Sequence, residues 1–371
     1  MATEKKKKRM TKAQKAKRKK RRIALFAGEA VALIVLVVAL VLVQKFNKMD
    51  KTEISEDDIV MNEGMDMETV DEEQISTNTG LGDHMENYWN IALFGVDSRT
   101  GSLGKGTRTD TILVASINQD TKAVRLVSVY RDTYLNIGND SYNKANAAYA
   151  KGGPVQAINM LNMNLDLNIT DYATVGWAGV ADTIDALGGV EINVEEDEIT
   201  HLNNYQVETS KSLGKSYTKV TSTGLQTLDG IQAVSYCRIR YTSGDDYKRT
   251  ERQREVIQAI VDKAKSASPT TLNSAANTIF DEVSTSLSLS EILSLIADVK
   301  SYTIADTTGI PFEEYRTSGT VSGKGSCVIP QTLTDSVLEL HKFLFDGAEG
   351  YTPSESVQEY SSKIASDTGK Y

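Results

Sequence analysis

The sequence predicts an α/β protein with a central mixed β-sheet and helices packed on both faces, preceded by one N-terminal transmembrane helix. Three observations support this class. Short β-branched runs at 91–96, 111–117 and 123–130, separated by turn residues, predict a strand meander. Later segments alternate between short strand patterns and apolar residues at helical spacing. Near the N-terminus, the 21 residues of 23–43 carry a single charge, Glu29.

The segments after residue 150 predict the helices and the remaining strands of this α/β fold. Pro154 indicates a helix start before an apolar stripe, and residues 176–187 predict a second helix that ends at a Gly-Gly pair. We expect further strands at 190–194 and 234–241, and further helices at 250–265, 290–299 and 332–345.

Charge is distributed unevenly along the 371 residues. Residues 1–22 hold 13 basic side chains and one acid, whereas residues 44–371 hold 28 basic and 48 acidic side chains, a net charge of −20. The apolar run 23–43 would span about 31 Å as a helix, close to the roughly 30 Å hydrocarbon core of a bilayer. Basic residues ahead of such a span keep the N-terminus in the cytoplasm. We therefore predict a single-pass protein of the cell membrane.

Composition predicts five regions along the chain. The first two are the basic cytoplasmic tail, 1–22, and an uncleaved signal anchor, 23–43. Residues 44–86 are acidic and polar without apolar periodicity, which predicts a flexible stalk. Residues 87–345 carry the patterns of one large extracellular domain, and we expect the polar residues 346–371 to form a disordered tail.

Several function classes are excluded by these features. A domain of net charge −20 does not attract nucleic acid through its general field, and an extracellular location excludes ATP-dependent kinase chemistry. The histidines His84, His201 and His341 are scattered and match no zinc or triad motif. Cys237 and Cys327 would form either one disulfide or two free thiols, and the sequence leaves both alternatives open.

Arginines concentrate in one part of this acidic region. Nine of its ten arginines lie between Arg99 and Arg254, and five lie within 238–254. Guanidinium groups bind phosphate oxygens bidentately, so the cluster predicts an anion site; a salt-bridged helix surface is the alternative. On the strand expected at 234–241, Arg238 and Arg240 point to the same face.

The helix expected after this strand adds further donors. Arg249 and Gln253 begin its inward apolar stripe near the helix N-terminus, where the helix dipole favours an anion. Arg252 and Arg254 lie off that stripe, and we expect both to be solvated.

Acidic residues stand at the ends of the three meander strands. Asp97 ends the first, Asp110 begins the second, and Arg131 with Asp132 ends the third, so antiparallel pairing places them at one sheet edge. Two carboxylates beside a phosphate site suit Mg²⁺ or Mn²⁺, which makes Asp97 and Asp110 the candidate metal ligands; each alone is also a typical turn or cap residue. Asp132 and Asp246 are candidates either for a general base or for orienting a guanidinium.

These residues lie in ordered motifs that resemble the LytR-CpsA-Psr family of envelope proteins. The similar segments, in chain order, are 91–99 with 108–111, then 128–133, 146–154, 182–190 and 228–253. Five ordered blocks are more specific than any one of them. The sequence departs from the family at Tyr130, where the motif usually has Pro.

The resemblance implies a ligase that transfers an anionic glycopolymer of the teichoic acid or capsule type. The donor is a polyprenyl pyrophosphate carrier, a membrane lipid, and the acceptor is a hydroxyl group of peptidoglycan. It implies an apolar lipid pocket between sheet and helices. It also implies that Asp97 and Asp110 hold Mg²⁺, and that the pyrophosphate is bound by Arg108, Arg131, Arg238, Arg240, Arg249 and Gln253.

We predict that Arg131, Asp132 and Asp246 act in catalysis. Two alternative functions use the same residues. One is a polyprenyl-pyrophosphate hydrolase with water as the acceptor, and the other is a non-catalytic regulator that binds the lipid carrier.

Overall fold

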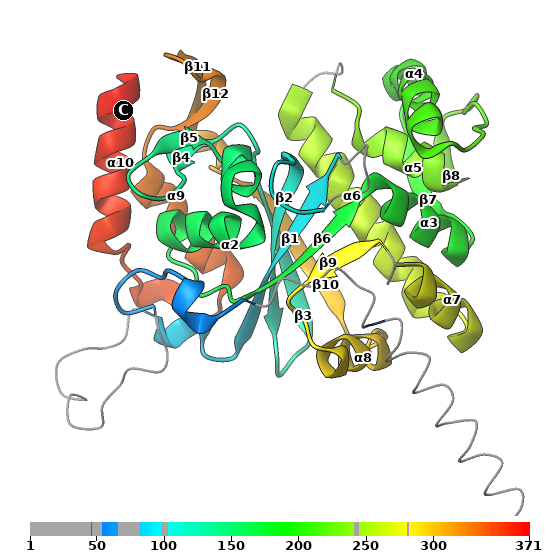
Figure 1. The fold of residues 1–371 in the computed structure, drawn as a ribbon, viewed down its shortest axis with the longest axis horizontal. Helices are drawn as coiled ribbons and strands as arrows, with labels where there is room; N and C mark the ends of the chain where they lie inside the picture. The colour runs from blue at the N-terminus through cyan, green and yellow to red at the C-terminus, as the bar shows by residue number, and fades with distance from the viewer. Residues whose placement is uncertain (1–45, 47–53, 66–81, 98–102, 241–244, 280–281) are drawn as a thin grey trace, which may run out of the picture. The chain divides into compact units, whose positions relative to one another are not determined.

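The computed structural model describes Phe46 and the segments 54–65, 82–97, 103–240, 245–279 and 282–371 (Figure 1). The basic tail and the apolar run 23–43 lie outside these residues, so the signal anchor stays a prediction. Within the described segments, no helix is both long and apolar enough to cross a membrane.

A six-stranded mixed sheet lies at the centre of the fold, in the order β10-β3-β2-β1-β6-β9. Strands β1, β2 and β3 form the antiparallel meander that the sequence predicts, while β6 is parallel to β1 and β10 is parallel to β3. Strand β9 is antiparallel to β6. The strand bounds are Tyr88–Val96 (β1), Thr109–Asn118 (β2), Ala123–Val129 (β3), Asp171–Gly176 (β6), Val283–Thr285 (β9) and Thr303–Ile310 (β10).

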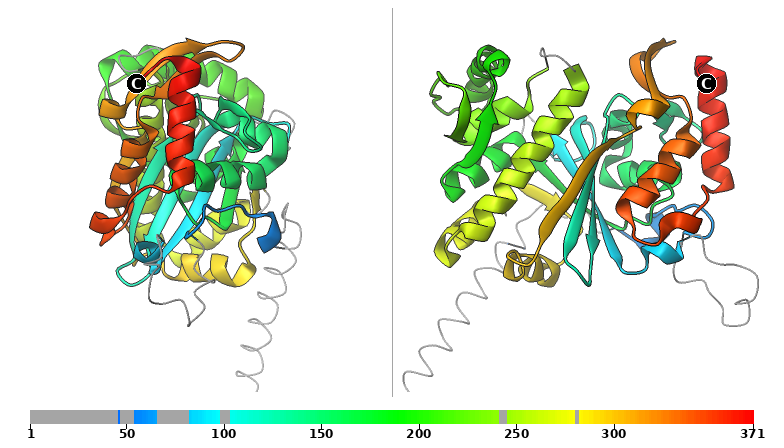
Figure 2. Two further views of the ribbon diagram at one scale, coloured as in Figure 1. Left: turned by 90° about the vertical axis from the view of Figure 1, so that its left-hand side faces the viewer. Right: turned by 180° about the vertical axis from the view of Figure 1, so that it is seen from behind.

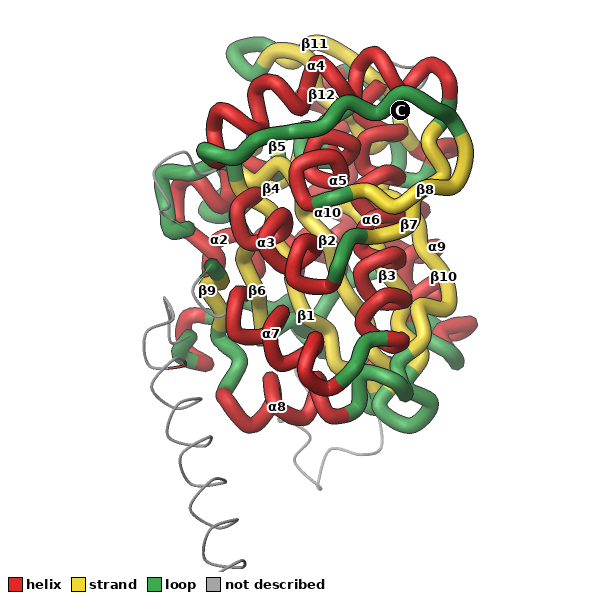
Figure 3. Tube along the Cα trace, turned by 90° about the vertical axis from the view of Figure 1, so that its right-hand side faces the viewer, coloured by secondary structure: helices red, strands yellow, loops and turns green. Residues whose placement is uncertain are grey.

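Helices lie on both sides of this sheet (Figure 1). On one side are α2 (Asn146–Leu165), α9 (Leu333–Leu344) and α10 (Glu355–Thr368); on the other are α3 (Trp177–Leu187), α5 (Gly230–Cys237), α6 (Asp245–Ser266) and α7 (Pro269–Ile279). Figure 3 shows α3 and α7 in front of the strands. The remaining helices are α4 (Glu196–Leu213) and α8 (Leu289–Ala297), with short 3₁₀ turns at Glu56–Asp58, Asp83–Met85, Glu313–Tyr315 and Ala348–Gly350.

Three antiparallel strand pairs complete the fold. They are β4 (Tyr134–Asn136) with β5 (Tyr142–Lys144), β7 (Val190–Val194) with β8 (Gly224–Leu228), and β11 (Arg316–Val321) with β12 (Gly325–Pro330).

Two hydrophobic cores hold these layers together. In the larger core, alternate strand residues such as Phe94, Val114 and Val127 pack against α2, α9 and α10. Side chains on one face of a sheet recur every second residue, which explains the spacing of such residues along each strand. The smaller core lies among α3 to α6 and the β7–β8 pair. The two thiols, Cys237 and Cys327, are buried and free.

The strand expected at 234–241 is wrong, because residues 230–237 form helix α5. Asp229 caps this helix: its side chain accepts from the Gln232 backbone, and the Gln232 side chain accepts from the Asp229 backbone. This reciprocal capping box favours a helix over the strand preference of the apolar residues that follow. Arg238 and Arg240 therefore follow a helix instead of sharing a strand face.

The stalk prediction is wrong for the part that the structure describes. Within 44–86, the fully buried Met65 and Met85 pack in the larger core, and the partly buried Ile59 packs against it. Composition alone did not predict this, because few apolar residues anchor the segment and they lack a regular period. Residues 66–81 lie outside the described part of the chain.

The expected disordered tail 346–371 is also wrong, because most of it forms α10. Figure 2 shows α10 beside α9. Ser354 caps its N-terminus by accepting from Val357, and Val357 and Ile364 are buried one heptad apart. A helix with a narrow apolar stripe can be polar in overall composition, which is why composition gave the wrong answer.

Candidate active site

A cavity of about 140 Å³ lies at the end of the central sheet where β1 ends and β2 begins. Helices α3, α4, α5 and α6 or the residues that follow them contribute to its walls. The lining residues are Asp97, Asp110, Trp177, Tyr205, Cys237, Arg238, Arg240, Arg249 and Gln253. The structure thus brings together both candidate metal ligands and four of the candidate pyrophosphate-binding residues.

Arg131 follows β3 and contacts three carboxylates beside this cavity. Its guanidinium donates to Asp110 and lies 3.5 Å from Asp132 and 3.7 Å from Asp246. Burial opposes the charge, but these three carboxylates together raise the pKa of Arg131 above its ordinary value. Antiparallel pairing of β2 with β3 places Asp110 and Arg131 at the same sheet edge.

Asp246, in the first turn of α6, is shared by three guanidinium groups. Arg249 lies 3.1 Å from it, Arg131 lies 3.7 Å away, and Arg240 lies 4.0 Å away. Arg240 also lies 3.9 Å from Asp110. With its oxygens occupied in this way, Asp246 has the arrangement expected of an orienting partner for arginines.

Arg249 and Gln253 are buried with incomplete hydrogen bonding. They are only 2% and 4% exposed, and neither the Arg249 Nε nor the Gln253 amide has a hydrogen-bond partner among the described residues. Burial lowers the pKa of Arg249 to about 10; Asp246 opposes that shift, and Arg131 and Arg240 add to it. The guanidinium stays charged at neutral pH. Each unpaired buried donor costs about 1–3 kcal/mol, a cost that a bound anion would remove.

Arg238 approaches the cavity from the residues after α5. Its Nη1 donates to Thr209 at 2.8 Å, and its guanidinium lies 5.3 Å from the centre of the Tyr205 ring. Tyr205, Trp177 and Cys237 line the cavity, and none was singled out from the sequence for the site. Burial raises the pKa of Cys237 to about 12, so this thiol stays protonated at neutral pH.

Of the lining residues that the sequence analysis did not name, Trp177 has a local sequence feature that places it at the site. It follows β6 directly and begins α3, so the strand order places it at the same sheet end as Asp97. Tyr205 offers no such signal, because its position depends on how α4 packs.

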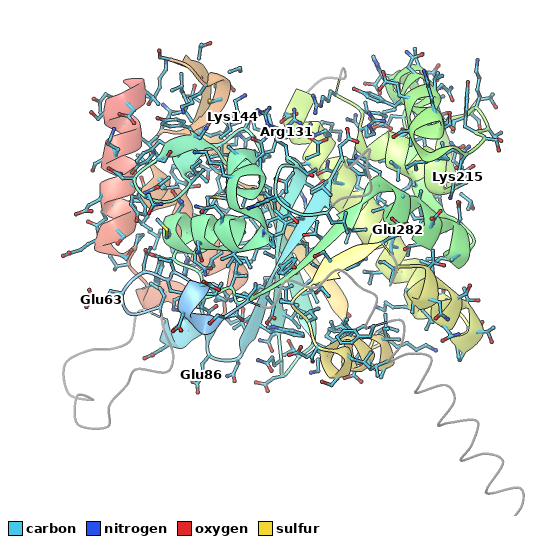
Figure 4. The ribbon with its side chains drawn as sticks, in the orientation of Figure 1. Glu63, Glu86, Arg131, Lys144, Lys215 and Glu282 are labelled. Carbon is cyan, nitrogen blue, oxygen red and sulfur yellow. The ribbon has the colours of Figure 1, made fainter. Side chains whose placement is uncertain are left out.

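Like Arg131 and Asp246, two further candidates lie outside the cavity lining. Arg108 is exposed and stands just before β2. Asp132 forms salt bridges with Lys144 at 3.0 Å and with Arg131 at 3.5 Å. Figure 4 labels these two basic residues near each other.

The expectation that Arg252 and Arg254 are solvated is wrong. Arg252 is 1% exposed and pairs with Glu198 of α4 at 2.7 Å. Arg254 is half-buried and donates to Ser128 of β3 at 2.7 Å. Helix α6 is covered both by the sheet and by α4 and β7, so residues away from its apolar stripe are buried as well.

The candidate metal site has two carboxylate donors from the protein, Asp97 and Asp110. Among the described residues, no group of three or more His, Cys, Asp or Glu side chains could hold a metal ion. Asp97 and Asp110 nevertheless line one cavity beside several arginines. Mg²⁺ is commonly bound by one or two carboxylates together with substrate phosphates and water. The two carboxylates therefore fit an ion that shares the cavity with a phosphate group.

The fold and the cavity define an α/β protein with an arginine-rich anion site at one end of its central sheet. The sequence model of the LytR_cpsA_psr family matches residues 42–340, and the chain belongs to this family. The resemblance seen in the motifs is thereby confirmed.

Similar proteins include a polyisoprenyl-teichoic acid–peptidoglycan teichoic acid transferase, TagU, of Enterococcus faecalis. It is 34% identical over 221 residues, which cover 57% of this chain and 66% of that protein, just under two thirds of its length. A solved Streptococcus agalactiae structure has a TM-score of 0.60 and 25% identity, covering 73% of this chain and 92% of that one.

A structure of the Bacillus subtilis protein TagT, with bound octaprenyl pyrophosphate lipid, shares the fold. The TM-score is 0.51 at 23% identity, covering 71% of this chain and 92% of that one. The mixed α/β class predicted from the sequence is confirmed by these likenesses.

Proposed function

We propose that this protein is a membrane-anchored phosphotransferase that moves an anionic glycopolymer, of the teichoic acid or capsule type, from polyprenyl pyrophosphate to a peptidoglycan hydroxyl, with Mg²⁺ as cofactor. The transferase name of the 34% identical relative supports the activity. The basic residues 1–22 and the apolar run 23–43 support a cell-membrane location with the folded domain outside.

The observation that carries the proposal is the excess of buried donors in the cavity. Arg249 is 2% exposed beside two further guanidinium groups, and the Gln253 amide has no partner among the described residues. A neutral sugar would not offset this concentration of positive charge. A pyrophosphate would, because it supplies several anionic oxygens within the reach of neighbouring arginines.

The proposed reaction follows from these groups. The hydroxyl oxygen of peptidoglycan attacks the glycopolymer-linked phosphorus, a new P–O bond forms, and the bond to the bridging oxygen breaks. Polyprenyl phosphate leaves with that oxygen and its electron pair. Arg131, Arg240 and Arg249 orient the pyrophosphate and stabilise the charge that develops on the bridging oxygen. Mg²⁺, held by Asp97 and Asp110, would neutralise further phosphate charge.

The hydroxyl proton must pass to a base as the new bond forms. We assign Asp246 an orienting role, because three arginines share its carboxylate. Asp132 is the proposed base. Among the described residues its carboxylate pairs with one arginine, Arg131 at 3.5 Å, and with Lys144 at 3.0 Å, and its side chain is 23% exposed. Arg108 stays a proposed pyrophosphate contact that would bind from the exposed rim.

The test uses the full-length protein in detergent with Mg²⁺, a polyprenyl-pyrophosphate glycan and peptidoglycan oligomers. A joined product supports the transferase. Free glycan phosphate in place of that product would identify a hydrolase, and binding without turnover would identify a regulator. Chelation of Mg²⁺ is expected to stop the transfer, and sustained full activity under chelation would remove the cofactor assignment.

A further inference from the structure

We propose that Arg316 is a positioning residue that holds the end of β3 and the start of α6 together, and thereby sets the separation of Arg131 and Asp246. The inference rests on the proposed function of that site. Arg316 is the first residue of β11, far from the site in sequence. Its two aromatic neighbours are Tyr130, which precedes Arg131, and Tyr247, which follows Asp246.

The contacts of Arg316 form a compact cluster. Its guanidinium carbon lies 3.9 Å from the centre of the Tyr247 ring and 5.0 Å from that of Tyr130. Its Nη1 donates to the Tyr130 hydroxyl at 3.1 Å and to the Pro311 carbonyl at 3.0 Å. The two tyrosine rings meet edge to face with their centres 4.7 Å apart. One guanidinium therefore joins three separate segments of the chain.

These interactions differ from an ordinary surface salt bridge. Within the described part of the chain, Arg316 pairs with no carboxylate; its partners are two ring faces and two oxygen atoms. Tyr130 is itself only 5% exposed, and its backbone N–H donates to the Ile310 carbonyl at 3.2 Å. Arg316 and Tyr247 are partly buried, and a cation held over aromatic faces fixes the rings as well as the cation.

The two tyrosines of the cluster are sequence neighbours of two residues of the candidate active site. Arg131 and Asp246 approach to 3.7 Å, and each is covalently bonded to a tyrosine of the cluster. A shift of either ring therefore moves the backbone of a site residue. A misplacement of about 1 Å in a site of this kind can cost about 100-fold in rate, even when the altered residue is remote.

Gly309 provides the space that this arrangement needs. It lies in β10, next to the end of β3, and a Cβ atom at this position would lie 2.3 Å from the Tyr130 hydroxyl. Tyr130 stands where the family motif usually has Pro. Gly309 thus leaves room for the tyrosine ring whose hydroxyl accepts from Arg316.

The experiment measures the affinity of the full-length protein for inorganic pyrophosphate with Mg²⁺ by titration calorimetry. Arg316→Ala is expected to weaken binding about tenfold. Arg316→Lys should restore only part of this loss, because an ammonium keeps the cation over Tyr247 but does not reproduce the guanidinium fork. Gly309→Ala should weaken binding by a similar factor, and the double variant should be no worse than the poorer single variant, because both displace the same ring.

Arg125, in β3, provides a matched control. It also joins β3 to the C-terminal region, by donating to the Leu344 carbonyl at 3.0 Å and to Asp346 at 2.8 Å, but at the other end of the strand. Arg125→Ala should change pyrophosphate affinity by less than about twofold at a comparable loss of thermal stability. If Arg316→Ala does not fold, Tyr130→Phe removes only the acceptor hydroxyl and should weaken binding about threefold.

The outcomes separate this inference from the proposed function. Equal affinities in Arg316→Ala and Arg125→Ala would overturn the positioning role and leave the transferase proposal intact. Additive losses in the Gly309 and Arg316 variants would also overturn it, because they would show independent effects. Wild-type protein that binds no pyrophosphate would overturn both proposals. Wild-type protein that binds pyrophosphate but transfers no glycan would overturn the transferase alone, and the Arg316 comparison would stand.

Discussion

Two buried charged groups differ in how completely their hydrogen bonds are formed. Asp166, at the end of α2, is fully buried and accepts from the Tyr351 hydroxyl at 2.6 Å and the Ser354 backbone at 2.7 Å. It also accepts from the Asn62 amide at 2.5 Å. Arg249 is nearly as buried, yet its Nε has no hydrogen-bond partner among the described residues, and the amide of nearby Gln253 has none either.

This difference in hydrogen bonding distinguishes a structural cluster, around Asp166, from a candidate binding site, around Arg249. The donors around Asp166 come from the N-terminal segment and the C-terminal region, so this carboxylate fastens both to the domain. Buried polar groups in native proteins are normally paired, and an unpaired one calls for an explanation. At Arg249 the proposed explanation is a ligand. Arg252, which pairs with Glu198 at 2.7 Å, shows that a buried arginine with a complete partner belongs to the first kind.

The largest expected effect is on the incomplete cluster. Arg131→Ala and Arg240→Ala should each lower glycopolymer transfer by about 100- to 1,000-fold, because each removes a cation that stabilises charge in the transition state. The thermal unfolding midpoint should change little, since carboxylates at this edge are shared among several arginines. Full transfer activity in either variant would remove the site assignment.

Asp166→Asn should affect stability and leave transfer intact. Asn tolerates the left-handed backbone at this position, where φ is +52°, so the change isolates the lost carboxylate. We expect a loss of about 3 kcal/mol in the free energy of unfolding, because several buried donors lose a charged acceptor. Denaturant titration measures the loss. Transfer per folded molecule should match the wild type, and a large fall in it would show that the two clusters are coupled.

Sequence predicted the sheet edge of the site because the relevant signals are local. Short β-branched runs separated by turn residues predicted the three meander strands, and consecutive antiparallel strands bring Asp110 and Arg131 to one edge. The helix that carries Arg249 and Gln253 followed from its apolar spacing. The segment at 234–241 was misread because its residues favour a strand in isolation, whereas the capping box before it and burial on all sides select a helix.

The remaining features depend on contacts between distant parts of the chain. Arg252 meets Glu198 across 54 residues, Arg316 meets Tyr130 across 186, and Ser354 meets Asp166 across 188. No local pattern indicates such pairs, because each depends on how complete elements pack. Whether a buried arginine is paired or awaits a ligand is therefore decided only in the fold.

Gln253→Leu should change stability and ligand affinity in opposite directions. Removing an unpaired buried amide should raise the free energy of unfolding by about 1 kcal/mol, while affinity for inorganic pyrophosphate falls about tenfold. Gln232→Leu is the matched control: this buried glutamine donates to the Thr218 carbonyl at 2.9 Å and accepts from Asp229 at 2.9 Å. The control should lose stability and keep its affinity. A destabilised Gln253→Leu would mean that the amide already has a partner.

A third buried group, His341, differs from both because its pairing depends on protonation. Its Nε2 lies 2.9 Å from the Leu165 carbonyl, so Nε2 carries the hydrogen and Nδ1 accepts from His84 Nε2 at 2.7 Å. Burial lowers the pKa of His341 to about 3. The unfolded chain, with an ordinary pKa near 6.5, takes up this proton first, so stability is lost as the pH falls from about 6.5 toward 3.

His341→Gln removes this titration and retains a side chain that can donate to the Leu165 carbonyl. The wild type should lose about 2 kcal/mol more stability than the variant between pH 6.5 and pH 5, at about 1.4 kcal/mol per pH unit. Urea unfolding of both proteins at the two pH values measures the difference. The carboxylates that titrate in this range are the same in both proteins and cancel in the comparison. Parallel losses of stability would show that His341 takes up its proton in the folded state.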